Sequence, residues 1–284
     1  MTSSVARGRQ GNEIGTLCLA ALLWIGTGCG PEIVPQEQEI FQGVYYHTQM
    51  LPDTEEARGL AHIVRIDLTH EEIELYATPV DSQQVEQQGA PYQLRHAAFV
   101  AWDKALAVTV NGALFQKEGW WPLPGRPAHS THTVVSDGVV SHVYPHSYLV
   151  WVDAENVPRI ERKKPPSPSA LDQAVWGIGG DEVVLREGAS RPNTERTPDR
   201  RTMLALHTER QQLWMAVFEH ASYRVAAETL AGVGAEAGIM LDGGGSTAMH
   251  IGAGATGIRS GTVLGGARPV ATHIGVRALP IERN

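Results

Sequence analysis

The chain has 284 residues, of which 42% are hydrophobic and 19% are charged, and it carries a formal charge of −8 at pH 7. This length suits one large domain or two smaller ones, and the composition is that of a globular protein. The negative charge excludes a general electrostatic attraction to nucleic acid or to an anionic membrane surface. We therefore expect any anionic ligand to be bound by locally placed arginine side chains.

The first 28 residues are predicted to be an export signal. Arg7 and Arg9 precede the apolar run IGTLCLAALLWIGTG, which has the length of a signal-peptide core and is short for a membrane span. The run ends in IGTGCG, which resembles the lipobox of bacterial lipoproteins and makes Cys29 the expected lipid anchor. The alternative is a plain cleaved signal, because Gly26 stands where a lipobox usually has leucine.

Residues 29–40 are predicted to be a flexible tether, because they are rich in Pro, Glu and Gln and poor in apolar residues. The folded domain is predicted to span residues 41–284. Cleavage at or before Cys29 leaves no cysteine pair, so burial of a core and not an intramolecular disulfide must stabilise the domain.

Beyond the tether, short runs of alternating apolar and polar residues predict many β-strands. Residues 61–68 and 72–79 are two such runs, and the short THE segment between them indicates a hairpin. An Asp137–Gly138 turn is predicted within residues 131–143. Further strands are predicted within residues 105–112, 147–153, 182–188, 201–208, 212–219, 238–242 and 269–279.

Two segments have helical patterns, namely residues 92–105 after Pro91 and residues 222–235, where Ser222 can cap the first turn. No change in composition marks a boundary within the folded part. The predicted fold class is therefore α+β, a single large domain of strand-rich mixed sheets with a few helices.

A proline-rich segment from Glu161 and an arginine-rich segment over residues 186–202 are predicted to be surface excursions. The second ends in Arg200 and Arg201, which open a strand. Either these arginines form a solvated face, or one guanidinium is directed inward at an oxyanion.

The stretch LDGGGSTAMH, residues 241–250, places Asp242 beside three glycines and two hydroxyls. Glycines let a ligand approach main-chain N–H groups, and the apolar residues on both sides argue against a linker. The spacing matches neither a phosphate-binding P-loop nor a G-x-S-x-G elbow, so Ser246 is not supported as a nucleophile. The 12 histidines lack the spacing of a zinc site.

Five motifs occur in an order that resembles the phosphodiester glycosidase family. They are NGALF (111–115), GIGGDEVVLREG (177–188), RRT (200–202), LDGGGSTAM (241–249) and GARPVATHIGV (266–276). The resemblance extends from about Gly43 to Val276. It implies a hydrolase that cleaves a glycosyl-1-phosphodiester outside the cytoplasm and releases the sugar and a phosphate monoester.

The chain departs from the family pattern at three places. Glu219 and the following residues replace an Asp-Gly-Arg turn, Ala267 replaces a glutamate, and Met240 replaces an asparagine. These departures keep a second hypothesis open, in which the protein is a non-catalytic, surface-anchored glycan-binding or exopolysaccharide-assembly protein on the same fold.

The resemblance implies roles for particular residues. Asp242 is expected to be the catalytic nucleophile or base, with the alternative that it only caps its turn. Asn111 is expected either to face the ligand or to end a strand. Arg201 and Arg268 are expected to clamp the phosphate, although Arg268 could instead pair with a surface carboxylate. The remaining candidates bind the same oxygens: Gly243, Gly244, Gly245, Ser246 and Thr247.

A second carboxylate is sought, in order, at Asp181, Glu118 and Glu219, and Asp181 is the one expected to contact substrate. Trp120 and Trp121 form either a packed loop or a platform for a sugar ring. The acid beside the turn also makes Ca²⁺ or Mg²⁺ a candidate cofactor. The expected partner is a phosphorylated glycan, with membrane contact only through the lipid anchor and no nucleic acid.

Overall fold

The computed structural model describes residues 36–117, 122–191 and 197–282. The chain forms two units, residues 1–33 and 34–284, and the description concerns the second. The predicted signal and Cys29 lie outside the described residues. The first strand, β1 (Gln38–Phe41), begins within residues 29–40, which were predicted as a flexible tether, and buries Ile40 of that segment together with Phe41.

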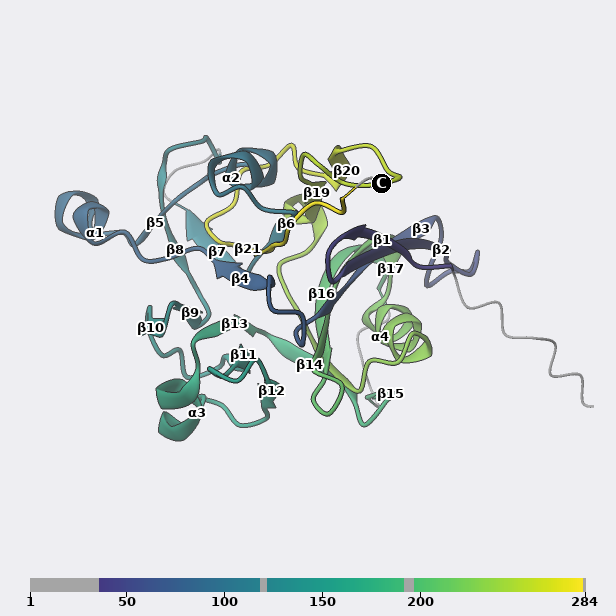
Figure 1. Cartoon of the computed structure of the whole chain (residues 1–284). Coiled ribbons are helices and arrows are strands. Elements are labelled where there is room, and N and C mark those ends of the chain that lie inside the picture. Colours follow the sequence, from purple (N-terminus) through teal and green to yellow (C-terminus); the bar gives the residue numbers. More distant parts are fainter. Residues whose placement is uncertain (1–35, 118–121, 192–196, 283–284) are drawn as a thin grey trace, which may run out of the picture. The chain divides into compact units, whose positions relative to one another are not determined.

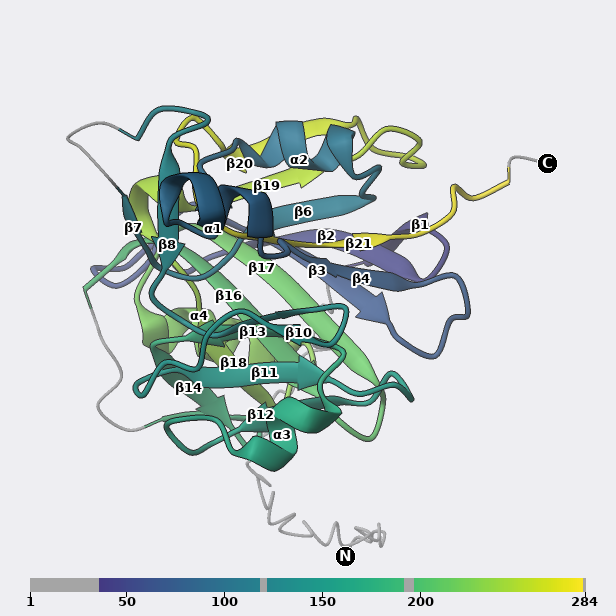
Figure 2. The same cartoon turned by 90° about the vertical axis from the view of Figure 1, so that its left-hand side faces the viewer.

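An eight-stranded antiparallel sheet contains the longest strands of the fold (Figures 1 and 2). Strands β16 and β17 are paired from Asp199–Ala221 to His207–Gln212 and lie at its centre. The strand order is β1 (Gln38–Phe41), β2 (Val44–Met50), β3 (Leu60–Asp67), β17 (Gln212–Ala221), β16 (Asp199–His207), β18 (Ala237–Met240), β14 (Glu182–Arg186) and β15 (Ala189–Ser190).

Three smaller antiparallel sheets complete the β-structure. One five-stranded sheet has the order β20 (Gly261–Gly265), β19 (Ala248–Ile251), β6 (Val108–Asn111), β21 (His273–Arg277) and β4 (Glu74–Ala77). The other has the order β10 (Val139–Val140), β9 (Val134–Ser136), β13 (Trp176–Gly180), β11 (Tyr148–Val152) and β12 (Pro158–Glu161). The three-stranded sheet consists of β5 (Tyr92–Gln93), β8 (Pro127–Ser130) and β7 (Phe115–Lys117).

The main hydrophobic core joins all four sheets. Val64 and Leu204 from the eight-stranded sheet pack in one cluster with Val108, Ile178 and Ala128 from the other three. The opposite face of the eight-stranded sheet is covered by α4 (Tyr223–Gly232), as Figure 1 shows, and forms a second apolar cluster. Because one core connects the sheets, the predicted α+β class and single domain are confirmed.

The helices agree in part with the sequence patterns. Ser222 caps α4 as predicted, with its hydroxyl accepting a hydrogen bond from the Val225 N–H at 3.2 Å. The helix α2 (Ala97–Asp103) begins later than predicted, because Tyr92 and Gln93 pair with β8. The structure adds two short helices that the sequence analysis did not predict: α1 (Ser82–Gln88) and α3 (Pro168–Gln173).

The predicted Asp137–Gly138 turn is confirmed, with φ values of 50° and 74° at its two central residues. The predicted hairpin over residues 61–79 is wrong. The first strand, β3, pairs with β2 and β17, whereas β4 pairs with β21 in another sheet. Both edges of β3 are therefore occupied by other strands, and the chain leaves the sheet after it.

Within the described ranges, every helix is too short or too polar to cross a lipid bilayer.

His273 is a titratable side chain buried in the core. It is 1% exposed, and its Nε2 atom has no hydrogen-bond partner among the described residues. Burial, together with the nearby positive charge of Arg95, lowers the pKa of His273 from 6.5 to about 3. The folded protein therefore holds this imidazole neutral over most of the acid range.

His273→Leu is expected to flatten the dependence of stability on pH. Between pH 6.5 and about 3 the unfolded chain protonates His273 and the folded chain does not, so stability is lost as the pH falls. Urea unfolding at pH 7 and pH 4.5 should show that the variant loses roughly 2 kcal/mol less stability than wild type over this interval. His142→Leu, at an exposed position, is the control, and equal pH dependence in all three proteins would contradict this account.

Candidate active site

The candidate residues lie where strands pass from one sheet to another. Asp242 follows β18 of the eight-stranded sheet and precedes β19 of a five-stranded sheet. Asp181 is the single residue between β13 and β14, which belong to two different sheets. Because Glu182 pairs with Met240 in antiparallel register, the segments that carry the two aspartates run side by side.

Asn111 holds the loop of Asp242 from within the protein. This residue ends β6 and is 0% exposed. Its Nδ2 donates to the carbonyl of Asp242 at 2.7 Å, and its Oδ1 accepts from Thr202 Oγ1 at 2.7 Å and from Ala248 N–H at 3.0 Å. The amide is therefore engaged with the protein, which favours a positioning role over direct contact with a ligand.

The carboxyl group of Asp242 lies half-buried at the start of the glycine loop. Burial raises the pKa of Asp242, and the Ser246 hydroxyl, the Arg268 guanidinium and the Gly243 N–H oppose this effect. Its environment therefore makes this carboxylate a stronger base than an ordinary aspartate.

Two arginines flank the glycine loop. A Cβ atom at Gly243 would lie 3.7 Å from Arg201 Nη1, and one at Gly245 would lie 3.7 Å from Arg268 Nη1. Gly244 has a φ of 57°, which favours glycine. The missing side chains thus keep open the space between this backbone and both guanidinium groups.

The side chain of Arg201 is held in place by the protein. Its Nε donates to the Ala221 carbonyl at 3.2 Å, its Nη2 donates to the Thr197 carbonyl at 2.6 Å, and the guanidinium lies over the Tyr223 ring at 4.4 Å. Among the atoms of this side chain, Nη1 comes closest to the position of a Cβ atom at Gly243, so the side chain presents this donor toward the loop. A fixed guanidinium is well suited to bind an oxyanion.

Three buried polar atoms near the loop have no well-formed hydrogen bond within the described residues. They are Ser246 Oγ, Thr247 Oγ1 and Arg268 Nε. Arg268 also lies over the Phe115 ring, at 5.5 Å from its centroid. Buried polar groups normally have a partner, and the oxygens of a bound phosphate would supply acceptors for these donors.

The environment of Asp181 differs from that of Asp242. Its side chain is 53% exposed, and Oδ1 lies 2.9 Å from Nε2 of the buried His132. This hydrogen bond lowers the pKa of Asp181, and the nearby His132, Lys164 and His146 add to the effect against the opposing influence of burial. Two carboxylates with opposite pKa shifts are typical of acid and base pairs in hydrolases.

The structure places the other proposed carboxylates less favourably or does not describe them. Glu219 accepts a hydrogen bond from the Leu60 N–H at 3.0 Å, so one of its oxygens is engaged by the backbone. Glu118, Trp120 and Trp121 lie outside the described residues.

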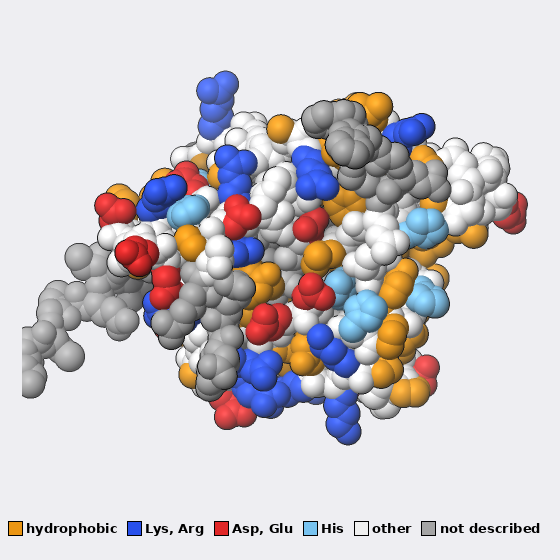
Figure 3. Space-filling model, turned by 180° about the vertical axis from the view of Figure 1, so that it is seen from behind, with side chains coloured by type: hydrophobic (Ala, Val, Ile, Leu, Met, Phe, Trp, Pro, Cys, Tyr) orange, Lys and Arg blue, Asp and Glu red, His pale blue; other side chains and the backbone are white. Residues whose placement is uncertain are grey.

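Figure 3 shows a face of the molecule on which acidic, basic and histidine side chains are interspersed.

The described residues do not form a side-chain cage for a metal ion. Within residues 36–117, 122–191 and 197–282, no group of three His, Cys, Asp or Glu side chains could hold one. This absence concerns side-chain ligands alone, and a Ca²⁺ or Mg²⁺ ion held by one acid, backbone carbonyls of the turn and the substrate phosphate stays a prediction.

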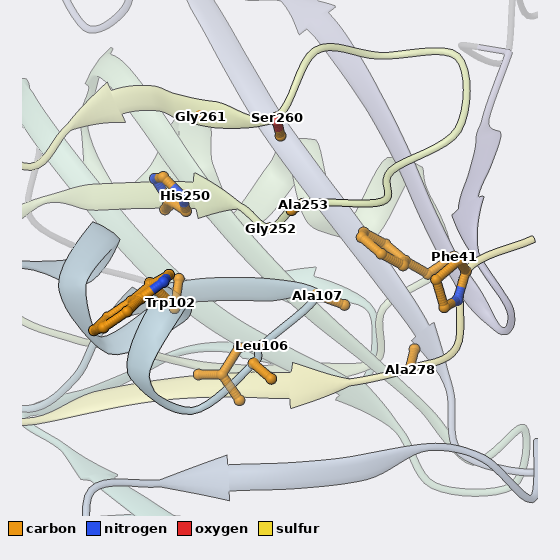
Figure 4. Close-up of a pocket in the computed structure, with 13 residues that line it drawn as sticks. Phe41, Trp102, Leu106, Ala107, His250, Gly252, Ala253, Ser260, Gly261 and Ala278 are labelled. Carbon is orange, nitrogen blue, oxygen red and sulfur yellow. The ribbon is translucent and has the colours of Figure 1, made fainter.

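A separate hollow of about 500 Å³ lies beside α2 and the strands β19 and β20 (Figure 4). Trp102, Leu106 and His250 line it, together with Phe41 near the beginning of the described chain. Neither Asp242 nor Asp181 lines this hollow, so it is distinct from the candidate active site.

Comparison with known proteins identifies the class. A family model described as phosphodiester glycosidase matches residues 104–277, and the chain belongs to this family of hydrolases. The structure is similar to the catalytic domain of zebrafish N-acetylglucosamine-1-phosphodiester alpha-N-acetylglucosaminidase. The TM-score is 0.60 at 14% identity, over 85% of this chain and 87% of that chain.

The fold is also similar to that of a hypothetical protein from Synechocystis. This TM-score is 0.56 at 13% identity, over 86% of this chain and 64% of that chain. No curated protein sequence matches the chain. At these identities, the structural likeness concerns the fold alone.

Sequence reasoning identified most of the residues that meet at this site and missed His132. Asp242, the glycines, Ser246, Thr247, Arg201, Arg268 and Asn111 are brought together around one loop. In the sequence, His132 is one of 12 histidines that lack the spacing of a zinc site. The sequence gives no sign that His132 pairs with Asp181, because the two residues lie in different strand connections and only the fold brings them together.

Asn111→Ala is expected to destabilise the protein by about 3 kcal/mol, because the substitution leaves several buried hydrogen-bonding groups without their partner. Thr202→Val removes only one of these bonds and should cost about 1 kcal/mol. Urea unfolding measures both free energies. If the two variants were equally stable, Asn111 would not be the residue that organises the loop.

Proposed function

We propose that the protein hydrolyses a glycosyl-1-phosphodiester and releases the sugar and a phosphate monoester. The observation that carries this proposal is the position of Asp242 beside an anion-binding cradle. Arg201 and Arg268 flank its glycine loop, the Ser246 hydroxyl lies against the Asp242 carboxyl group, and Thr247 Oγ1 is buried there without a hydrogen-bond partner among the described residues. A base next to such a cradle suits a substrate with a sugar on one side and a phosphate on the other.

The reaction breaks the bond between the anomeric carbon and the bridging phosphate oxygen. A water molecule adds to the anomeric carbon and gives its proton to Asp242. The electron pair of the broken bond stays on the phosphate oxygen, where the two guanidinium groups stabilise the negative charge. A phosphate monoester is a better leaving group than a sugar alkoxide, so the site needs little acid catalysis on that side.

The opposite pKa shifts of Asp242 and Asp181 suit these two residues to different roles. Asp242, with its raised pKa, accepts the proton from water more readily than an ordinary aspartate. Asp181, with its lowered pKa, stays ionised and stabilises the positive charge that develops on the sugar ring.

Asp242→Asn should remove the base and lower turnover of a sugar-1-phosphodiester by at least about a thousandfold. The free energy of unfolding should stay the same or rise, because the folded state raises the pKa of Asp242 and so disfavours its charged form. Sugar release and thermal unfolding measure the two effects.

Asp172→Asn, an exposed substitution on α3, is the control and should leave activity unchanged. Retained turnover in Asp242→Asn would remove Asp242 from the mechanism. Absence of turnover in wild type, together with measurable glycan binding, would favour the non-catalytic glycan-binding function.

Arg268→Gln should weaken binding of the phosphodiester by roughly 10- to 100-fold, because it removes a charge-assisted hydrogen-bond donor from the phosphate cradle. The KM for a sugar-1-phosphodiester and the inhibition constant of a neutral sugar measure this effect separately. Arg210→Gln alters an exposed arginine and should change neither value. Equal losses for the charged and the neutral ligand would argue against a phosphate cradle.

The sequence of the first 29 residues further supports export and a lipid anchor at Cys29 in a bacterial cell envelope. The substrate would then be a phosphorylated glycan outside the cytoplasm, and the anchor would be the only membrane contact. The charge of −8 agrees with a partner that is not nucleic acid.

Cys29→Ser should move the exported protein from the membrane fraction to the soluble fraction, because the acylated thiol is the attachment point. Fractionation after expression with the native leader measures this change. Cys18→Ser is the matched control and should leave the distribution as in wild type. Unchanged membrane association of the Cys29 variant would contradict the anchor.

A further inference from the structure

The buried side chain of His132 connects two elements of the site. The ring is almost fully enclosed, with 3% of its side chain exposed. Its Nδ1 lies 3.0 Å from Thr131 Oγ1, and its Nε2 lies 2.9 Å from Asp181 Oδ1. Thr131 Oγ1 lies in turn 3.0 Å from the Leu114 carbonyl, which also accepts the Thr131 N–H at 2.8 Å. The imidazole is therefore fixed at both nitrogens.

The glycines before Asp181 permit this arrangement. A Cβ atom at Gly179 would lie 3.0 Å from His132 Cβ and 2.1 Å from Ser147 Oγ, and a Cβ at Gly180 would lie 2.4 Å from the Met240 carbonyl. Any larger residue would push β13 away from His132 or from β18. The GIGG segment thus brings the Asp181 carboxylate to the buried imidazole.

We propose that His132 is a positioning residue of the active site, which orients the Asp181 carboxylate toward the reacting sugar and holds it as an anion. This role rests on the proposed function. Asp181 is half-exposed, so without His132 its side chain would be free to rotate and to be solvated. A fixed carboxylate stabilises a developing positive charge without reorganising during the reaction.

The hydrogen-bond partners of His132 determine which of its ring nitrogens carries a proton. If the Thr131 hydroxyl donates to His132 Nδ1, the ring is neutral and its hydrogen is on Nε2. If the hydroxyl donates to the Leu114 carbonyl, Nδ1 donates to Thr131 and the ring is cationic. In both arrangements Nε2–H faces the ionised Asp181, and Thr131 decides only the charge of the ring.

Two further side chains lie close to the pair of His132 and Asp181. His146 lies edge-on to His132, with ring centroids 5.9 Å apart. Lys164 donates from Nζ to the Asp181 carbonyl at 2.8 Å. Asp242 is the opposing carboxylate, and His132 acts electrostatically on it as well. When its ring is cationic, His132 favours the charged form of both aspartates, and in either arrangement it donates its hydrogen bond to Asp181.

The test compares wild type with His132→Ala, His132→Gln and the control His129→Ala. Glutamine can place an amide N–H close to the position of Nε2, so it should restore the bond to Asp181. We expect His132→Ala to lower kcat about tenfold or more with little change in KM, and to shift the acidic limb of the pH profile upward. His132→Gln should recover most of kcat, and His129→Ala should match wild type.

Nuclear magnetic resonance tests the pair independently of turnover. Nitrogen-15 spectra of the imidazoles should show Nε2 of His132 protonated, and titration of the Asp181 side-chain carbon should show a higher midpoint in His132→Ala than in wild type. A bare Nε2, or the same Asp181 midpoint in both proteins, would overturn the proposal. If these signals agree but wild type hydrolyses no phosphodiester, the pairing is correct and the proposed function is wrong.

If His132→Ala does not fold, the comparison of wild type with His132→Gln decides. If the glutamine of His132→Gln restores the bond to Asp181, the titration midpoint of the Asp181 side-chain carbon should stay close to that of wild type. A kcat and pH profile identical to wild type in a folded His132→Ala would show that His132 has no positioning role.

Discussion

The side-chain amide of Asn111 joins backbone and side-chain groups from two sheets at a position with no access to solvent. It bonds the Asp242 carbonyl, the Thr202 hydroxyl and the Ala248 N–H, and so fixes where the chain leaves the eight-stranded sheet and enters its neighbour. The glycine loop connects Asp242 to Ala248, and the amide of Asn111 therefore holds it at both ends. The path of the glycine loop, and with it the position of Asp242, therefore depends on one buried side chain.

Burial and charge act in opposite directions on the two aspartates of the site. Asp242 is enclosed enough for burial to raise its pKa despite the nearby Arg268, whereas the hydrogen bond from His132 lowers the pKa of the more exposed Asp181. One carboxylate is thus prepared to take up a proton and the other to remain an anion. The proposed mechanism needs both properties, because water must lose a proton while positive charge develops on the sugar.

Features determined by neighbouring residues were predictable from the sequence. The Asp137–Gly138 turn and the Ser222 cap each need only a few adjacent residues, and both are confirmed. The hairpin over residues 61–79 was predicted from local pattern, but the competing strands β2 and β17 occupy both edges of β3. Motif order singled out the loop of Asp242, around which the structure places Asn111, Arg201 and Arg268. It could not show that the amide of Asn111 is bonded to Thr202 and Ala248, which lie 91 and 137 positions further along the chain. Nor could it show that His132 contacts Asp181.

The most direct test of the central claim is the position of bond cleavage. Hydrolysis of a sugar-1-phosphodiester in water enriched in oxygen-18, followed immediately by mass spectrometry of both products, shows which atom water attacked. Attack at the anomeric carbon, as the arrangement of Asp242 and the arginine cradle predicts, puts the heavy oxygen on the sugar and leaves the phosphate monoester unlabelled. Heavy oxygen in the phosphate monoester would show cleavage of the phosphorus–oxygen bond and would contradict the account.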